Sequence, residues 1–125
     1  MKKRNAYVLT RLYYTDASKN SPFMTRFTRT IQSIVKNAEH YEDGQVIWIL
    51  YDDSPESSYE KDKEAVLSLI ERNGVNKENI HHSRSEKPGN SAYATLCIRN
   101  IFLDLTEQDS DAFVISLDQD DELEP

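Results

Sequence analysis

The sequence predicts an α/β fold of the doubly wound type, in which helices cover both faces of a mostly parallel sheet. Strand patterns and helix patterns alternate along the 125 residues, and right-handed crossovers convert that order into parallel strands. Two strand segments, residues 46–51 and 112–117, are almost continuously apolar, which is typical of strands buried on both faces. The length fits one compact domain, so we expect residues 1–125 to form a single unit.

The first half of the chain predicts a strand, a helix and a second strand. Residues 6–12 are β-prone and lie between polar segments. Ser21 and Pro22 then provide an N-cap followed by proline at the first helical position, which predicts a helix that ends near Asn37. Its apolar positions recur at steps of three and four: Phe23, Phe27, Ile31, Ile34 and Val35. A turn leads into the apolar strand of residues 46–51.

The second half repeats the alternation. Ser57 or Ser58 is expected to cap a helix that closes at Asn73 and Gly74, where glycine permits a left-handed C-cap. A short strand is then expected at residues 80–83 and a polar loop at residues 85–90. A helix with a broad apolar face follows at residues 92–105, and a final buried strand at residues 112–117.

Composition argues against several classes of protein. The net charge is -7, and residues 101–125 hold nine Asp and Glu and no base, which argues against a nucleic-acid partner. The single Cys97 can form neither an internal disulfide nor a cysteine metal cage. The longest apolar run is far below the roughly 20 residues that cross a bilayer, and no signal-peptide core follows the basic start. We therefore expect no transmembrane segment and a cytoplasmic location.

Acidic residues follow both apolar strands. In a doubly wound sheet, ligands bind beyond the carboxyl ends of the strands, where the winding reverses. Residues 10–20, after the first strand, contain no glycine, which argues against a dinucleotide fingerprint, a P-loop and a nucleotidyltransferase loop. By contrast, a pair of aspartates follows the second strand and three follow the last one: Asp52, Asp53, Asp118, Asp120 and Asp121.

The three aspartates after the last strand indicate a divalent-cation site. Mg²⁺ and Mn²⁺ prefer carboxylate oxygens, and Mg²⁺ typically joins one or two carboxylates to substrate phosphates. An EF-hand fits poorly, because Leu123 stands where the calcium loop needs glycine. A phosphatase of the Asp-x-Asp type fits poorly too, because Glu122 stands where Thr or Val is needed. The alternative interpretation is a solvated acidic tail, although the run begins directly after an apolar strand.

Three blocks of the sequence share a pattern with a known family. Thr10 closes the first strand ahead of an amphipathic helix. Residues 46–54 form an apolar strand that ends in Asp52-Asp53-Ser54, with Ser54 where the family's Asp-Asp-Gly-Ser has glycine. Residues 115–125 match an Asp-x-Asp-Asp-x-Leu-x-Pro block. Together these blocks resemble the N-terminal, nucleotide-sugar-binding half of a family 2 glycosyltransferase, which implies a GT-A fold with a Rossmann-like half.

The resemblance implies roles for the residues that match. In that family the last Asp of the second strand recognises uracil or another base, so Asp53, with Asp52 beside it, would contact the base. Thr10 would line the base pocket, and Arg11 and Lys87 would belong to the same substrate-binding set. Further candidates from the family's third helix are Asn90, Arg99 and Asn100.

The acidic block would bind the diphosphate and the metal. By the family's pattern, Asp118 and Asp120 would face the ribose and the sugar. Either Asp120 or Asp121 would bind Mn²⁺ or Mg²⁺, and the register leaves both open.

The function implied by the resemblance is transfer of a sugar from a nucleotide-diphospho-sugar, with a UDP-sugar foremost, to a carbohydrate or lipid-linked acceptor. Family members continue past this block into an acceptor site and a general base. We therefore expect the catalytic base to lie beyond Pro125 and the domain to be truncated before its acceptor-binding part. The alternative function is a non-catalytic nucleotide-binding or partner-dependent module with the same fold.

Overall fold

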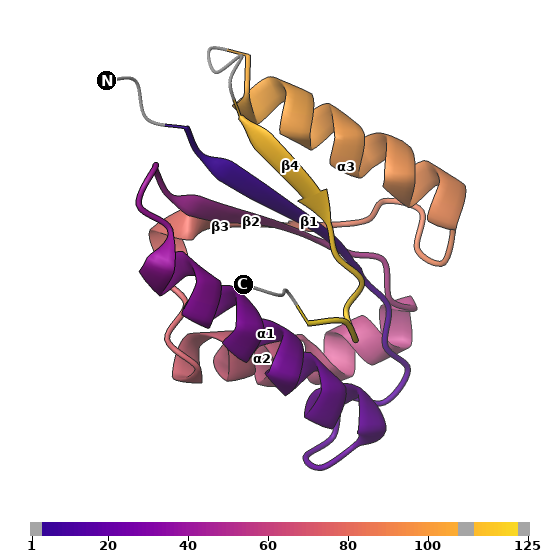
Figure 1. Cartoon of the computed structure of the whole chain (residues 1–125). Coiled ribbons are helices and arrows are strands. Elements are labelled where there is room, and N and C mark those ends of the chain that lie inside the picture. Colours follow the sequence, from indigo (N-terminus) through magenta and orange to yellow (C-terminus); the bar gives the residue numbers. More distant parts are fainter. Residues whose placement is uncertain (1–3, 108–111, 123–125) are drawn as a thin grey trace.

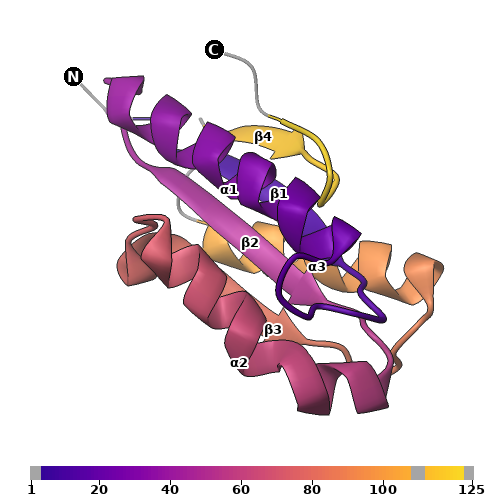
Figure 2. The same cartoon turned by 90° about the horizontal axis from the view of Figure 1, so that it is seen from below.

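The doubly wound α/β fold is confirmed by a computed structural model, which describes residues 4–107 and 112–122. All four strands are parallel, in the order β3-β2-β1-β4. Helices α1 and α2 cover one face of the sheet and α3 covers the other (Figures 1 and 2). The elements are β1 (Ala6–Leu12), α1 (Pro22–His40), β2 (Val46–Asp52), α2 (Glu56–Arg72), η1 (Lys77–Asn79), β3 (Ile80–Arg84), α3 (Ser91–Leu105) and β4 (Phe113–Ser116).

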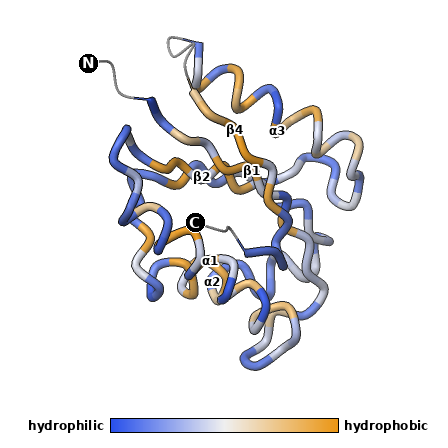
Figure 3. Tube along the Cα trace, viewed as in Figure 1, coloured by the Kyte–Doolittle hydropathy of each residue, from blue (hydrophilic) through white to orange (hydrophobic). Residues whose placement is uncertain are grey.

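Two apolar cores hold the layers together, one on each face of the sheet. Between the sheet and α1–α2, Phe27 of α1 packs against Trp48 of β2, with ring centroids 5.7 Å apart. On the α3 face, Tyr7 of β1 meets Phe102 edge-on at 5.5 Å. Figure 3 shows apolar segments both in the strands and along the helices that cover them. Because side chains alternate along a strand, β1 and β2 contribute to both cores.

The ends of the helices follow the expected signals at most points. Ser21 caps α1, because its hydroxyl accepts from the Met24 N–H at 3.2 Å, and the helix runs to His40, a turn past the expected end. Gly74 has a φ of 88°, which confirms the left-handed closure after α2. The expected cap at Ser57 or Ser58 was wrong. The N-cap of α2 is Pro55, without a side-chain hydrogen bond, and the Ser58 hydroxyl instead donates to the Thr15 carbonyl at 3.3 Å.

Strand β4 exists as expected, but its expected burial was wrong. All four of its residues are exposed. The physical reason is its position, because β4 is the last strand of the sheet and α3 packs against β1 and β2. An apolar sequence therefore lies at an edge that the described residues leave uncovered.

No helix within the described ranges combines the length and apolarity needed to cross a bilayer.

Candidate functional site

The candidate site lies at the carboxyl edge of the sheet, where all four parallel strands end. The winding reverses between β1 and β4, because the chain leaves β1 for β2 in one direction and joins β4 on the other side. Ligands of doubly wound folds bind at this reversal. The last residues of β1 supply Arg11 to this edge, and the segments after β2 and β4 supply Asp53 and Asp118.

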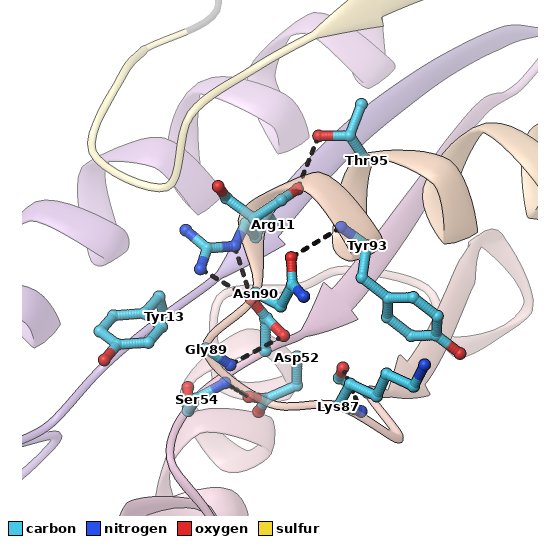
Figure 4. Close-up of polar contacts among 12 residues, drawn as sticks. Arg11, Tyr13, Asp52, Ser54, Lys87, Gly89, Asn90, Tyr93 and Thr95 are labelled. Atoms are coloured by element: carbon cyan, nitrogen blue, oxygen red, sulfur yellow. Dashed lines mark hydrogen bonds and ion pairs between the residues drawn. The ribbon is translucent and has the colours of Figure 1, made fainter.

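Asp53 is fully buried and paired with Arg11. The Arg11 side chain donates from Nε to Asp53 Oδ2 at 2.8 Å, and its Nη2 lies 2.7 Å from the same oxygen. The Gly89 N–H donates to Oδ1 at 3.2 Å (Figure 4). Both carboxylate oxygens therefore have partners, and a base that bound Asp53 would have to share it with Arg11.

Asp52 is buried in a second network. Its Oδ2 accepts from the Tyr14 hydroxyl at 2.9 Å, and its Oδ1 accepts from the Ser54 N–H at 3.0 Å. Arg84 Nη1 lies 3.6 Å from Oδ1. Burial raises the pKa of the Tyr14 phenol far above its usual value, and the Asp52 charge raises it further. These contacts make Asp52 an anchor for the segment after β1, so the two adjacent aspartates hold different parts of the edge.

Thr10 lies in the α1–α2 core. Its side chain is buried, and its Oγ1 accepts from Trp48 Nε1 at 2.9 Å. Arg11, the next residue, points to the opposite face and is partly exposed there. Of these two predicted substrate residues, only Arg11 reaches the surface of the candidate site.

Lys87 lies in the exposed loop between β3 and α3. Its Nζ stands 4.9 Å from the centre of the Tyr93 ring, and Figure 4 shows the two side chains next to each other. Asn90 accepts from the Tyr93 N–H at 3.0 Å and so caps α3. The structure thus gives Asn90 a local role and places Lys87 beside the first turn of α3.

The three aspartates after β4 converge. Asp118, Asp120 and Asp121 are exposed, and one carboxylate oxygen from each lies within 4.8 Å of the others. We call them the acidic triad. Mg²⁺–oxygen bonds are about 2.1 Å long in near-octahedral geometry, so neighbouring ligand oxygens are about 3.0 Å apart and opposite ones about 4.2 Å. The donor type fits Mg²⁺ or Mn²⁺, and the three oxygens would have to draw closer together to share one ion.

Gln119 and Thr30 fix the turn that carries the acidic triad. The Tyr13 N–H donates to Gln119 Oε1 at 2.7 Å, and Gln119 Nε2 donates to the Tyr13 carbonyl at 2.8 Å. The Thr30 hydroxyl of α1 lies 2.6 Å from the Asp121 carbonyl and 2.9 Å from the Gln119 carbonyl. The Asp121 N–H closes the turn on the Asp118 carbonyl at 3.1 Å.

Sequence reasoning did not find Gln119 or Thr30. Two signals pointed to them. Gln119 is the only uncharged residue among 118–122, and Thr30 is a polar residue within the apolar face of α1.

A groove between α3 and β4 leads to the acidic triad. Its volume is about 470 Å³, and its polar lining residues include Arg11, Thr95, Arg99 and Asp118. The rest of the lining is largely apolar and includes Leu9, Ile98 and Phe102. An elongated ligand with one anionic part and one flat or apolar part suits such a surface.

Comparison of this chain with protein-family models, with curated proteins and with solved structures found no match.

Proposed function

We propose that the chain binds a nucleotide-diphospho-sugar together with Mn²⁺ or Mg²⁺ at the carboxyl edge of the sheet. The observation that carries the proposal is the convergence of the acidic triad beside the β1–β4 reversal. Three carboxylates repel a diphosphate, and a divalent cation between them turns that repulsion into attraction. Asp118, Asp120 and Asp121 would hold the cation, which would neutralise the diphosphate.

The groove supports the same ligand class. Arg11 and Arg99 line the groove together with Asp118, and the apolar lining can cover a base or a sugar ring. The activity that we propose is that of a family 2-like glycosyltransferase, with a UDP-sugar as donor and a carbohydrate or lipid-linked acceptor.

A non-catalytic nucleotide-binding or partner-dependent module is the second candidate. It needs no general base, and the two other carboxylates at this edge do not supply one. Asp52 and Asp53 are both buried, and each lies next to an arginine, so neither is free to take a proton from an acceptor hydroxyl. The second candidate uses the same metal and nucleotide but transfers no sugar.

Calorimetry with UDP tests the binding proposal. We expect affinity to be at least tenfold higher with Mn²⁺ than with a chelator, because the cation links triad and diphosphate. Asp121→Asn should remove this Mn²⁺ dependence. Asp53→Asn should weaken nucleotide binding about ten- to a hundred-fold and leave the Mn²⁺ dependence intact, since a lost hydrogen bond to a charged group costs about 1–3 kcal/mol. Equal affinity with Mn²⁺ and with chelator would refute the proposal.

Hydrolysis and transfer assays separate the two candidates. Release of UDP from a UDP-sugar in the presence of Mn²⁺ supports the transferase. Tight, Mn²⁺-dependent binding without any turnover supports the non-catalytic module.

A further inference from the structure

The Arg11 side chain holds Asp53 with only one edge of its guanidinium group. Its Nε and Nη2 both contact Asp53 Oδ2, at 2.8 and 2.7 Å. These two nitrogens share one edge of the planar group, so Nη1 is directed away from the carboxylate. Among the described residues nothing bonds Nη1, and in Figure 4 the third nitrogen of Arg11 carries no dashed line. Because Arg11 is 32% exposed and lines the groove, these unused donors are open to a ligand.

Asp53 itself is closed to a ligand in the groove. Its side chain is fully buried, its Oδ2 faces Arg11, and its Oδ1 accepts from the Gly89 N–H at 3.2 Å. A carboxylate enclosed in this way fixes the orientation of the guanidinium group that it binds. The effect of Asp53 on a ligand would therefore pass through Arg11.

Tyr13 links Arg11 to the turn that carries the acidic triad. The Tyr13 ring centre lies 5.0 Å from the guanidinium carbon of Arg11. The main chain of Tyr13 makes two hydrogen bonds with the Gln119 side chain, and Asp118 lines the same groove as Arg11. A diphosphate bound through a cation at the acidic triad would therefore lie at the same end of the sheet as the unused donors of Arg11.

We infer that Arg11 donates to a phosphate oxygen of the diphosphate, and that Asp53 is a positioning residue that acts on the ligand only through Arg11. The planar, forked donors of arginine match the oxygens of a phosphate group. An arginine that is already held in place loses less side-chain entropy when the ligand binds. The inference rests on the proposed function, and it replaces a direct contact between Asp53 and the base.

Inorganic pyrophosphate tests the role of Asp53, because it carries phosphates and no base. Calorimetry in the presence of Mn²⁺ compares wild type with Asp53→Asn for pyrophosphate and for UDP. Both affinities should fall by the same factor, about tenfold or more, because the guanidinium group loses its charged partner. If Asp53 acted only as a nearby negative charge, its removal would instead strengthen the binding of phosphates. The affinity for Mn²⁺ alone should stay unchanged, which separates positioning from a general loss of structure.

Arg11→Lys tests the donor and keeps its charge. A single ammonium group cannot present two edges as guanidinium does, so the affinity for pyrophosphate should fall about fivefold or more. Arg84→Lys is the matched control, because Arg84 also lies beside a buried carboxylate, 3.6 Å from Asp52 Oδ1, but is not a lining residue of the groove. This control should leave the affinity for pyrophosphate unchanged. Circular dichroism checks the fold of each variant, and Arg11→Lys tests the proposal even if Asp53→Asn fails to fold.

The double variant Arg11→Lys/Asp53→Asn tests the link between the two residues. It should bind pyrophosphate within about twofold of Arg11→Lys alone, because Asp53 then has no guanidinium group to position. Independent, additive losses would overturn the inference.

The outcomes distinguish this inference from the proposed function. If UDP binds equally with Mn²⁺ and with chelator, the proposed function fails and the inference fails with it. If UDP binding depends on Mn²⁺ but Asp53→Asn weakens UDP and not pyrophosphate, the proposed function stands and Asp53 contacts the base directly. That result, or equal pyrophosphate affinities in Arg11→Lys and Arg84→Lys, would overturn the inference alone.

Discussion

The Gln119 side chain pairs with the main chain of Tyr13 as a neighbouring strand would, accepting at 2.7 Å and donating at 2.8 Å. The residue between two aspartates of the acidic triad thereby joins the segment after β4 to the segment after β1. These segments lie on the two sides of the sheet reversal.

We therefore predict that Gln119→Ala weakens Mn²⁺ binding although it removes no carboxylate. Loss of two hydrogen bonds, each worth about 1 kcal/mol, releases the turn and should lower Mn²⁺ affinity about five- to thirtyfold. Electron paramagnetic resonance of free Mn²⁺ measures this change. Gln32→Ala is the matched control, because Gln32 is an exposed glutamine of α1 that bonds only Asn73 in the contacts observed. Equal Mn²⁺ affinity in Gln119→Ala and wild type would contradict a positioning role.

A second prediction concerns the pair of Arg11 and Asp53. Arg11→Met should lower the free energy of unfolding by roughly 2–4 kcal/mol, because it leaves the fully buried Asp53 carboxylate without its cation. We place the value below that of a wholly buried pair because the Arg11 side chain is 32% exposed. Urea denaturation measures the loss.

The double variant Arg11→Met/Asp53→Asn tests the cause of that loss. If the unpaired carboxylate is responsible, the double variant should be more stable than the sum of the two single losses indicates. Strict additivity would show that the two side chains act independently.

A third prediction concerns Thr10. Thr10→Val keeps the shape of the side chain but removes the acceptor of the buried Trp48 N–H, which should cost about 1–3 kcal/mol of folding free energy. Thr10→Ser keeps the hydroxyl acceptor and should therefore lose less folding free energy than Thr10→Val. Thermal or urea unfolding followed by Trp48 fluorescence reports both. A Thr10→Val protein as stable as wild type would show that the Trp48 N–H finds another partner.

The fourth prediction is a pH dependence of stability that arises at His82 on β3. Burial lowers the pKa of His82 below its ordinary value of 6.5; Asp52 opposes this shift, and His81 adds to it. Between the two pKa values, His82 is protonated in the unfolded chain and neutral in the folded chain. Stability should therefore fall as the pH drops below about 6.5, until the pKa of folded His82 is reached. His82→Gln should flatten this part of the profile. An unchanged slope between pH 6.5 and 5.5 in the variant would rule out His82 as its source.

Local patterns in the sequence were sufficient to predict most of the fold. Apolar periodicity, Ser21 with Pro22, and Gly74 predicted the elements, and the alternation of elements predicted their parallel pairing. The burial of β4 could not be predicted in this way, because continuous apolarity shows what a strand can bury and not whether another element covers it.

The candidate site was predictable in part. The acidic triad follows from sequence spacing alone, and the structure brings its members together. The burial of Thr10 could be predicted from the alternation of side chains along β1. Thr10 lies on the same face of the strand as Val8 and Leu12, whose side chains lie in the α1–α2 core. The contacts of Thr30 with the turn that carries the acidic triad could not be predicted from the sequence. They join residues about ninety positions apart, and no local pattern encodes them.

The central position of β1 has a consequence for the order in which the protein folds. Strand β1 pairs Ala6 with Val46 on one edge and with Phe113 on the other, and the second pairing closes a loop more than twice as long. Longer loops cost more entropy to close, so β1, β2 and β3 can assemble while β4 is still unattached. The turn that carries the acidic triad can contact Tyr13 and Thr30 only after β4 has paired with β1. A cation that binds the ordered turn more tightly than the disordered one would therefore stabilise the product of this last folding step.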